Sequence, residues 1–276
     1  MKSIFFCFIL FFLWSDVGSA APPGRIISLA PSVTEIICAL GLERNLAGVT
    51  TYCDQPPSVR AKPKVGGPAN PSLERIIALR PEVVVLDEEG LGPRLAGRLA
   101  RLGIRTVVFR GARLSGLAGG IRRLGSDLGA PTEGERLAAR IERALLPAKG
   151  KKPLPRALFI IWPDPLITAG SGTVIDDALR LAGYENIAAG GREPYPRLSL
   201  EAVMSRRPDI IIVGQGHVMG PPLEKLLRRL APLEAVRKRR ICLVDDALYR
   251  SGPRIPEGID ELRRCARGYL ARYGIK

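Results

Sequence analysis

The chain has 276 residues, and its 42 lysine and arginine residues outnumber its 27 acidic residues, which gives a net charge of +15. A positive balance of this size suits nucleic acid, anionic lipid or an acidic ligand as a partner. The arginines are scattered along the chain, and aromatic residues make up only 5% of it, too few for a base-stacking surface. We therefore exclude nucleic acid binding and expect the positive charges to lie on solvated helix faces.

The first twenty residues are typical of an export signal. They begin with Met1 and Lys2, continue in an apolar stretch at residues 4–14, and end in small residues at 18–21. This order predicts a cleavable secretory signal peptide over residues 1–20. The apolar stretch is shorter than the roughly 20 residues of a membrane span, and an uncleaved anchor is the alternative interpretation.

An internal repeat organises the rest of the chain. Residues 73–85 align without a gap on residues 200–212, and each copy has the pattern of a short helix, a proline stop and a β-branched strand. Ser72 and Ser199 stand one residue before the copies, where a helix N-cap is expected. The continuous apolar run that ends each copy is typical of a parallel strand covered on both faces.

A second, weaker repeat lies upstream of each copy. Residues 32–35 form a capping box that predicts a helix ending at Gly41, and residues 173–176 begin a matching helix that ends at Gly183. Strand-like runs precede both helices, at residues 25–29 and 157–161. Each half thus alternates strands and helices, which predicts an α/β fold with mainly parallel sheets flanked by helices.

The periodicity between the two halves is helical. Apolar residues recur at Ile121, Leu124 and Leu128 and, beyond Pro131, at Leu137, Ile141 and Leu145. We expect a long backbone helix in a connecting segment, residues 119–148, that braces the two halves. The N-terminal α/β lobe is then predicted at residues 22–118 and the C-terminal α/β lobe at 149–276, with a final helix from Glu257 to about Arg272.

Export leaves four cysteines in a compartment where disulfides persist. They are Cys38, Cys53, Cys242 and Cys265, and three connectivities exist for them. In a two-lobed chain we favour pairing within each half, Cys38 with Cys53 and Cys242 with Cys265, because a bridge between the lobes would lock them. The first pair is equally compatible with two free thiols.

Candidate ligand-binding residues follow from the rule that ligands bind outside the carboxyl ends of parallel strands. Aromatic side chains with polar tips in these loops suit a large, flat ligand of mixed polarity, although they equally serve to pack the loops. His217 is either a simple loop donor or an axial nitrogen for the metal of a bound macrocycle. The candidates are Ser32, Tyr52 and Gly67 in the first half, and Trp162, Tyr195, His217 and Arg254 in the second.

Catalytic machinery is missing from the sequence. His217 is the single histidine, so a multi-histidine zinc site is excluded, and no metalloprotease motif, nucleophile elbow or paired-cysteine metal motif occurs. We therefore predict a binding protein with no catalytic residue, no metal site and no cofactor of its own. An exported α/β enzyme is the less favoured alternative.

Several separated motifs together resemble the periplasmic cobalamin-binding proteins of ABC importers, which are class III substrate-binding proteins. The motifs stand at residues 28–35, 48–54, 66–67, 162–170 and 252–254, together with the two copies of the repeat. The similarity covers essentially the whole chain after the signal. It implies a periplasmic monomer that binds cobalamin or another corrinoid between its lobes and delivers it to an ABC permease dimer.

The resemblance also implies a docking role for two glutamates. Proteins of this kind place one glutamate on each lobe against arginines of the permease, and the matching positions here are Glu74 and Glu201. The alternative is that these residues only stabilise the first turn of a helix. Receptors for haem and ferric siderophores share the fold, and Arg250 and Arg254 could pair with the carboxylates of such ligands.

Overall fold

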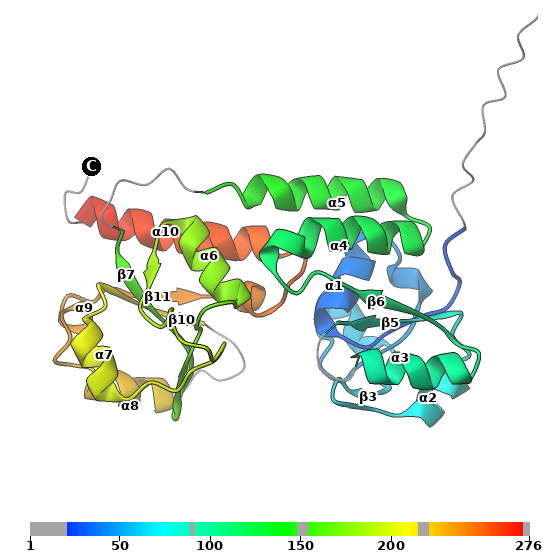
Figure 1. Cartoon of the computed structure of the whole chain (residues 1–276), viewed down its shortest axis with the longest axis horizontal. Helices are drawn as coiled ribbons and strands as arrows, with labels where there is room; N and C mark the ends of the chain where they lie inside the picture. Colours follow the sequence, from blue (N-terminus) through cyan, green and yellow to red (C-terminus); the bar gives the residue numbers. More distant parts are fainter. Residues whose placement is uncertain (1–20, 89–91, 148–153, 215–220, 273–276) are drawn as a thin grey trace, which may run out of the picture.

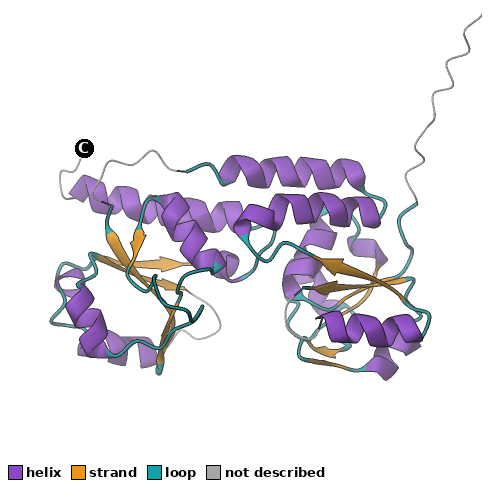
Figure 2. Ribbon diagram, in the orientation of Figure 1, coloured by secondary structure: helices purple, strands orange, loops and turns teal. Residues whose placement is uncertain are grey.

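The computed structural model describes residues 21–88, 92–147, 154–214 and 221–272, which form two lobes side by side (Figure 1). The expected signal segment, residues 1–20, and His217 lie outside the described residues. Each lobe contains a mainly parallel sheet with helices packed on it (Figure 2), which confirms the predicted fold class. None of the described helices has both the length and the apolar character that a bilayer crossing requires.

The N-terminal lobe is built on a four-stranded parallel sheet with the order β2-β1-β5-β6. Its strands are β1 (Ile26–Ser28), β2 (Leu46–Val49), β5 (Val83–Asp87) and β6 (Arg105–Phe109), and a separate small hairpin pairs β3 (Gly66–Gly67) with β4 (Asn70–Pro71). Its helices are α1 (Pro31–Ala39), α2 (Leu73–Ala78) and α3 (Gly92–Arg101), with the short 3-10 helices η1 (Glu43–Asn45) and η2 (Pro57–Ala61). Parallel pairing brings the carboxyl ends of all four strands to one edge of the sheet.

The C-terminal lobe contains a five-stranded sheet in which β11, β10, β7 and β9 are parallel and β8 is antiparallel. Its strands are β7 (Arg156–Pro163), β8 (Leu166–Thr168), β9 (Glu185–Asn186), β10 (Ile210–Gly214) and β11 (Ile241–Val244). Its helices are α6 (Val174–Ala182), α7 (Leu200–Arg206), α8 (Pro221–Arg229), α9 (Glu234–Arg237), the 3-10 helix η3 (Asp246–Tyr249) and the final helix α10 (Ile255–Arg272). The antiparallel β8 has no counterpart in the N-terminal sheet.

The sequence repeat becomes two equivalent structural units, α2 with β5 and α7 with β10. Both predicted caps form: Ser72 Oγ accepts a hydrogen bond from the Arg75 amide, and Ser199 Oγ accepts one from the Ala202 amide. In each lobe the repeated strand pairs in parallel with the first strand, β5 with β1 and β10 with β7. The same arrangement of a short helix and two paired parallel strands therefore occurs at the centre of each lobe.

The segment between the lobes is a pair of helices, α4 (Leu114–Asp127) and α5 (Pro131–Ala144), instead of one long helix. The chain reverses at Gly129, whose φ of +72° is a left-handed conformation that glycine adopts readily, and Pro131 then opens α5. The two helices pack closely at two further glycines, because a Cβ added to Gly125 would lie 2.9 Å from the Cα of Gly134. Figure 1 shows α4, α5 and α10 along one side of the molecule.

The predicted capping box at residues 32–35 is wrong. Helix α1 begins at Pro31 after an extended Ala30, and no side chain caps it, because the alanine at the N-cap has no hydrogen-bond acceptor in its side chain. The polar groups of the expected box serve tertiary contacts instead. Thr34 Oγ1 donates to Ser28 Oγ (2.8 Å), and the carboxylate of Glu35 binds arginines from the other end of the chain.

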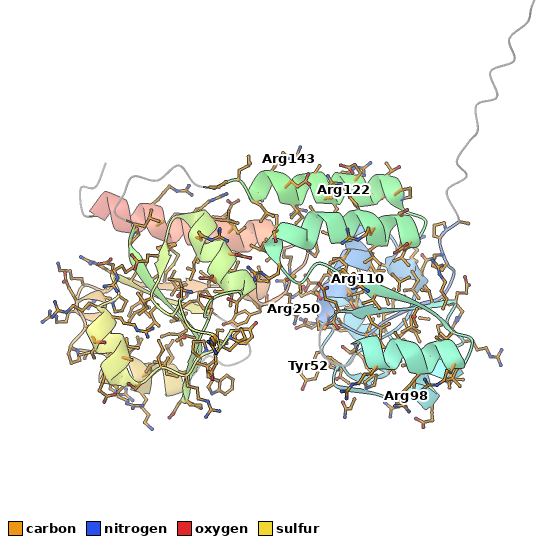
Figure 3. All side chains as sticks on the ribbon, viewed as in Figure 1. Tyr52, Arg98, Arg110, Arg122, Arg143 and Arg250 are labelled. Carbon is orange, nitrogen blue, oxygen red and sulfur yellow. A yellow bond between two sulfur atoms is a disulfide. The ribbon has the colours of Figure 1, made fainter. Side chains whose placement is uncertain are left out.

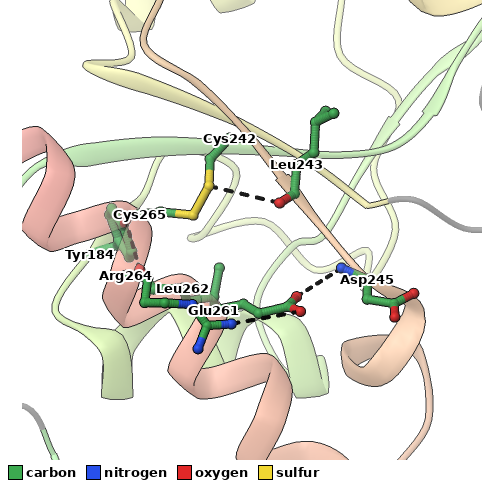
Figure 4. Close-up of a disulfide and its surroundings, with 8 residues drawn as sticks. All are labelled: Tyr184, Cys242, Leu243, Asp245, Glu261, Leu262, Arg264 and Cys265. Atoms are coloured by element: carbon green, nitrogen blue, oxygen red, sulfur yellow. Dashed lines mark hydrogen bonds and ion pairs between the residues drawn. A yellow bond between two sulfur atoms is a disulfide. The ribbon is translucent and has the colours of Figure 1, made fainter.

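The predicted disulfide between Cys242 and Cys265 is confirmed, and it ties β11 to α10 with 6.1 Å between the Cα atoms (Figure 4). The pairing of Cys38 with Cys53 does not form, and both thiols are free, which is the alternative that the sequence left equally open. Cys53 is buried and its sulfur accepts a hydrogen bond from Thr34 Oγ1 at 3.1 Å, so the sulfur is already part of a polar cluster. Burial raises the pKa of the Cys38 thiol to about 12, which keeps it protonated at neutral pH.

One continuous apolar core joins the two lobes. The largest cluster of buried side chains runs from α1 and the N-terminal sheet through α4 to α6, α10 and the C-terminal sheet. Val33, Leu117, Leu179 and Leu262 are fully buried members of this cluster from four successive parts of the chain. Smaller cores lie under α3 in one lobe and under α8 in the other. The shared core resists separation of the lobes because opening it would expose apolar surface.

A buried ion-pair network links α1 of the N-terminal lobe to the chain after β11. Glu35 is only 4% exposed, and its carboxylate accepts from Arg250 Nη1 (3.0 Å) and from Arg254 Nε (2.9 Å). Arg250 also donates to Asp54 (2.7 Å), and Arg254 to Asp246 (2.6 Å). A charge this deeply buried is stable only when it is paired. The network therefore fixes how the C-terminal segment lies against α1.

We expect Glu35→Gln to destabilise the protein by about 3 kcal/mol, because two largely buried guanidinium groups lose their shared carboxylate. The change in the free energy of unfolding is measured by urea denaturation. Glu135→Gln is the matched control, since Glu135 makes an ion pair with Arg122 on the exposed face of α4 and α5 and its loss should change stability little. Equal midpoints for Glu35→Gln and the wild type would show that the network does not hold the lobes.

Candidate ligand-binding site

A cavity of about 820 Å³ lies between the two lobes. This volume is within the range of pockets that enclose drug-sized and larger ligands. Residues at the carboxyl ends of the N-terminal strands line one wall, as expected for an open parallel sheet. They are Ser32 after β1, Tyr52 after β2, Asp87 and Glu88 at the end of β5, and Phe109 at the end of β6.

The opposite wall comes from the C-terminal lobe. Ile161 of β7 and Ile167 of β8 supply apolar surface, and Thr173 to Ile175 bring the first turn of α6 to the cavity. Tyr195 approaches from the loop before α7, and residues 248–251 follow from η3. Both lobes thus contribute, and a bound molecule would contact each of them.

Two tyrosines stand at the cavity with unusually large exposure. Tyr52 is 64% exposed and Tyr195 is 56% exposed, while most large apolar side chains of the described residues are buried. Figure 3 shows Tyr52 on the side of the N-terminal lobe that faces the C-terminal lobe. Exposed aromatic side chains in a concave site provide flat contact area for a ligand at little conformational cost.

Tyr249 gives the cavity a more rigid aromatic surface. Its ring lies edge-on to the buried ring of Phe159, with 6.2 Å between centroids. Its hydroxyl is buried and has no hydrogen-bond partner among the described residues. Burial raises the pKa of Tyr249 to about 12, and the nearby carboxylate of Asp246 adds to this rise, so the phenol is neutral at physiological pH.

The arginines that line the cavity are paired with carboxylates inside the protein. Arg250 binds Glu35 and Asp54, and Arg113 contacts both oxygens of Asp177 at 3.3 Å. Burial would lower the pKa of Arg250, but the hydrogen bonds to the two carboxylates outweigh burial and raise it. The lining contains two basic residues, Arg113 and Arg250, and two acidic ones, Asp87 and Glu88, so its formal charges balance although the chain as a whole is strongly basic.

The lining also contains a structural carboxylate. Glu88 Oε1 accepts hydrogen bonds from the amides of Gly111 (2.9 Å) and Ala112 (3.0 Å), which fixes the loop between β6 and α4. Ser251 Oγ donates to the carbonyl of Ala112 (2.6 Å), so the same loop is tied to the C-terminal segment. These contacts hold the loop between β6 and α4 in place at the side of the cavity where the two lobes meet.

Three of the predicted ligand-binding residues, Ser32, Tyr52 and Tyr195, line this cavity. Gly67 does not line it but supports it, because a Cβ at this position would lie 2.7 Å from Asn70 Oδ1 and 3.8 Å from the ring of Tyr52. His217 is outside the described residues.

Trp162 and Arg254 do not line the cavity. Trp162 is 39% exposed and its Nε1 donates to the carbonyl of Asp164 (2.8 Å) in the turn that follows β7. Arg254 is not part of the cavity lining, and its guanidinium group donates hydrogen bonds to Glu35 and Asp246. Arg254 therefore positions Glu35 in this structure, and its neighbour Arg250 is the arginine at the cavity.

Sequence reasoning missed Phe109 and Arg113 as lining residues. Phe109 ends the strand at Arg105–Phe109, and Arg113 lies a few residues after it. This strand begins shortly after helix α3 ends at Arg101. Recognition of this strand as the fourth parallel strand of the lobe would have placed Phe109 at the ligand edge. Among the residues that the structure describes, no group of three or more potential ligands is arranged to hold a metal ion.

The two predicted docking glutamates occupy matching places outside the cavity. Glu74 and Glu201 are exposed in the first turns of α2 and α7, and Figure 1 shows these helices on the side of the molecule away from α4 and α5. Ser72 Oγ donates to Glu74 Oε2 (2.8 Å), which lowers the pKa of Glu74. Backbone hydrogen bonds, followed by Ser199, lower the pKa of Glu201. Both carboxylates are ionised at neutral pH.

Comparison with known proteins places the chain among solute receptors. The sequence profile of the periplasmic binding protein family matches residues 26–248. The vitamin B12-binding protein of Photorhabdus laumondii is 31% identical over 258 residues, which is 92% of each chain. That of Salmonella typhimurium is 31% identical over 215 residues, or 77% of this chain and 80% of its own.

Solved structures of two kinds of receptor share the fold. The periplasmic vitamin B12 binding protein of Vibrio cholerae matches with a TM-score of 0.73 at 25% identity, covering 90% of this chain and 98% of its own. The periplasmic heme-binding protein of Roseiflexus sp. RS-1 matches with a TM-score of 0.76 at 31% identity, covering 89% and 98%. The matches span both lobes, and the chain belongs to the periplasmic binding protein family, whose members are not enzymes but bind a small molecule for an ABC transporter.

Proposed function

We propose that this protein binds cobalamin or a related corrinoid in the periplasm and delivers it to an ABC permease dimer. In this proposal the segment 1–20 is removed on export, and the mature protein acts as a monomer. The relatives named as vitamin B12-binding proteins support the ligand, because their similarity extends over both walls of the cavity.

The balanced charge of the cavity is the observation that carries the choice of a corrinoid. Cobalamin presents mainly amide side chains around its ring, whereas haem carries two ionised propionates and many ferric siderophores are anionic. An anionic ligand gains most from arginines that have no other partner, but Arg113 and Arg250 are already bound to carboxylates. Hydroxyl groups of Tyr52, Tyr195 and Ser32 can exchange hydrogen bonds with amides without a change of charge.

A haem receptor is the second candidate, and one feature of the site favours it. Phenol oxygens ligate haem iron in some proteins, and Tyr52 and Tyr195 present such oxygens at the mouth of the cavity. The heme-binding structural relatives are as similar to this chain as the vitamin B12-binding ones. His217 is a further proposed axial ligand for the metal of either macrocycle.

Calorimetric titration with cyanocobalamin, haemin and a ferric siderophore separates these candidates. We expect one cyanocobalamin per protein and a dissociation constant at least tenfold lower than that of the other two ligands, a difference of about 1.4 kcal/mol. Tighter binding of haemin, with a Soret shift that Tyr52→Phe abolishes, would replace the corrinoid by haem as the ligand.

Replacement of Tyr52 by alanine should raise the dissociation constant for cyanocobalamin about tenfold, because an aromatic contact in a ligand cavity contributes roughly 1 kcal/mol or more. The same titration measures the change. Leu146→Ala is a matched control, since Leu146 is 65% exposed, much like Tyr52, and does not line the cavity. Unchanged affinity in Tyr52→Ala would remove this residue from the site.

We further propose that Glu74 and Glu201 dock the protein onto the permease. Each lies exposed in the first turn of a repeated helix, and the two helices lie on one side of the molecule. Two equivalent acidic groups suit a partner that has two-fold symmetry and presents a basic group on each subunit. Their lowered pKa values keep the negative charges in place under mildly acidic conditions.

The double substitution Glu74→Ala and Glu201→Ala should abolish ligand uptake while ligand affinity stays unchanged, because both charges face the partner and neither lines the cavity. Uptake is measured in cells that lack the native receptor. The control carries Glu135→Ala and Glu142→Ala, which remove the same charge from the opposite side of the molecule. Wild-type uptake in the first variant would refute the docking assignment.

A further inference from the structure

Helix α3 carries three arginines and no acidic residue. Arg94, Arg98 and Arg101 are spaced four and three residues apart, which places them on one side of the helix, and all three are exposed. Leu95 and Leu99 are buried and pack the helix against the N-terminal sheet. The helix therefore faces the sheet with its leucines and presents solvent with three positive charges, which we call the α3 stripe.

The charges of the α3 stripe are not balanced within the protein. In the described part of the chain, none of the three arginines forms an ion pair. Like charges three and four residues apart on a helix repel each other. The helix dipole favours Arg98 and Arg101 in the last turn, but it disfavours Arg94, the third residue of the helix, near its positive end. The stripe thus lowers the stability of α3, and a negatively charged partner would relieve this repulsion.

Helix α5 shows how such a stripe is balanced on a helix that only faces solvent. Its three arginines have the same spacing as those of α3, but they are accompanied by three glutamates, so the charges of the helix cancel. These residues are Arg136, Arg140 and Arg143 with Glu133, Glu135 and Glu142. Solvation of an exposed helix therefore does not by itself account for the missing acids of α3.

The α3 stripe is not repeated on α8 of the C-terminal lobe. Glu224 stands in the first turn of α8, where it pairs with Arg228 (3.7 Å), and Lys225 pairs with Asp164 (3.8 Å). A permease dimer with two-fold symmetry favours the same charges on both lobes. A stripe on one lobe alone instead suits a continuous charged surface that has no such symmetry.

The stripe lies on the side of the molecule that the proposed docking turns toward the membrane. Helix α2, which carries Glu74, and α3 pack on the same face of the N-terminal sheet through one small apolar core. Figure 3 shows Arg98 on the side of this lobe away from α4 and α5. Leu102 directly after α3 is 53% exposed, and Ile77 of α2 is 47% exposed. Apolar side chains on a basic surface are typical of proteins that touch the headgroup region of a bilayer.

We propose that the α3 stripe binds the anionic headgroups of the bilayer beside the docked permease. Each arginine adds a modest attraction to an anionic bilayer, and salt screens it, so three arginines hold the protein weakly and reversibly. Together with the glutamate contacts, this second contact raises the effective concentration of the receptor at the permease. The inference rests on the proposed docking, because docking through α2 and α7 is what turns α3 toward the lipid.

The experiment measures binding of the full-length exported protein to vesicles of phosphatidylglycerol and phosphatidylcholine in equal parts, and to vesicles of phosphatidylcholine alone. The variant carries Arg94→Gln, Arg98→Gln and Arg101→Gln. The matched control carries Arg136→Gln, Arg140→Gln and Arg143→Gln, which remove the same charge at the same spacing from α5. Figure 3 shows Arg143 on the opposite side of the molecule from Arg98.

We expect the wild type to bind the anionic vesicles and not the neutral ones, with binding that falls as salt is added. The α3 variant should bind the anionic vesicles about tenfold more weakly, and the α5 control should lose less than about twofold. Its urea midpoint should not fall, because the substitutions remove repulsion between like charges. Equal binding of the wild type to both kinds of vesicle would overturn the inference, and so would equal losses in the two variants.

A further variant separates this inference from the docking proposal on which it rests. Glu74→Ala with Glu201→Ala should bind the anionic vesicles at least as well as the wild type, because lipid headgroups do not need the carboxylates. If this variant transports ligand normally while the α3 variant loses vesicle binding, the docking assignment fails and the lipid contact of α3 stands. If it loses uptake while the α3 variant binds vesicles like the wild type, docking stands and the lipid contact is overturned.

Discussion

The relative placement of the two lobes depends on one buried carboxylate. Glu35 comes from α1, and the arginines that bind it come from the chain after β11, more than 200 residues away. Both segments line or support the ligand cavity, through Ser32 on one side and Tyr249 and Arg250 on the other. Since a buried charge without partners costs several kcal/mol, the network permits little independent movement of these two walls. The continuous apolar core through α4, α6 and α10 has the same effect.

This constraint also determines the electrostatics of the cavity. The chain carries a large excess of positive charge, yet the arginines nearest the ligand space are held by Glu35, Asp54 and Asp177. Their positive charge therefore stabilises the junction of the lobes instead of attracting an anion. The exposed excess lies elsewhere, for example on α3, which carries Arg94, Arg98 and Arg101 and no acidic residue.

Sequence patterns predicted the helices, strands and caps that depend on neighbouring residues. They missed the contacts between residues that are far apart in the sequence. The repeat predicted both parallel units and the serine caps, because a short helix and a buried strand need only neighbouring residues. The capping box failed because Pro31 starts the helix and Glu35 has its partners at the other end of the chain. Arg254 was predicted to contact the ligand, but its guanidinium group binds Glu35, a partner that lies far away in the sequence. Cys38 and Cys53 looked compatible with a disulfide, but Cys53 already contacts two buried threonines.

The two lobes are alike where they would meet a symmetric partner and different where they meet the ligand. Helices α2 and α7 begin at identical serine caps, and α3 and α8 repeat the same leucine spacing. Around the cavity, in contrast, β8 and the chain after β11 have no equivalents in the N-terminal lobe. A duplicated fold can keep its outer face two-fold symmetric only if changes that fit an asymmetric ligand are confined to the loops between the lobes. The same scaffold is found in proteins named for binding vitamin B12 and in proteins named for binding heme.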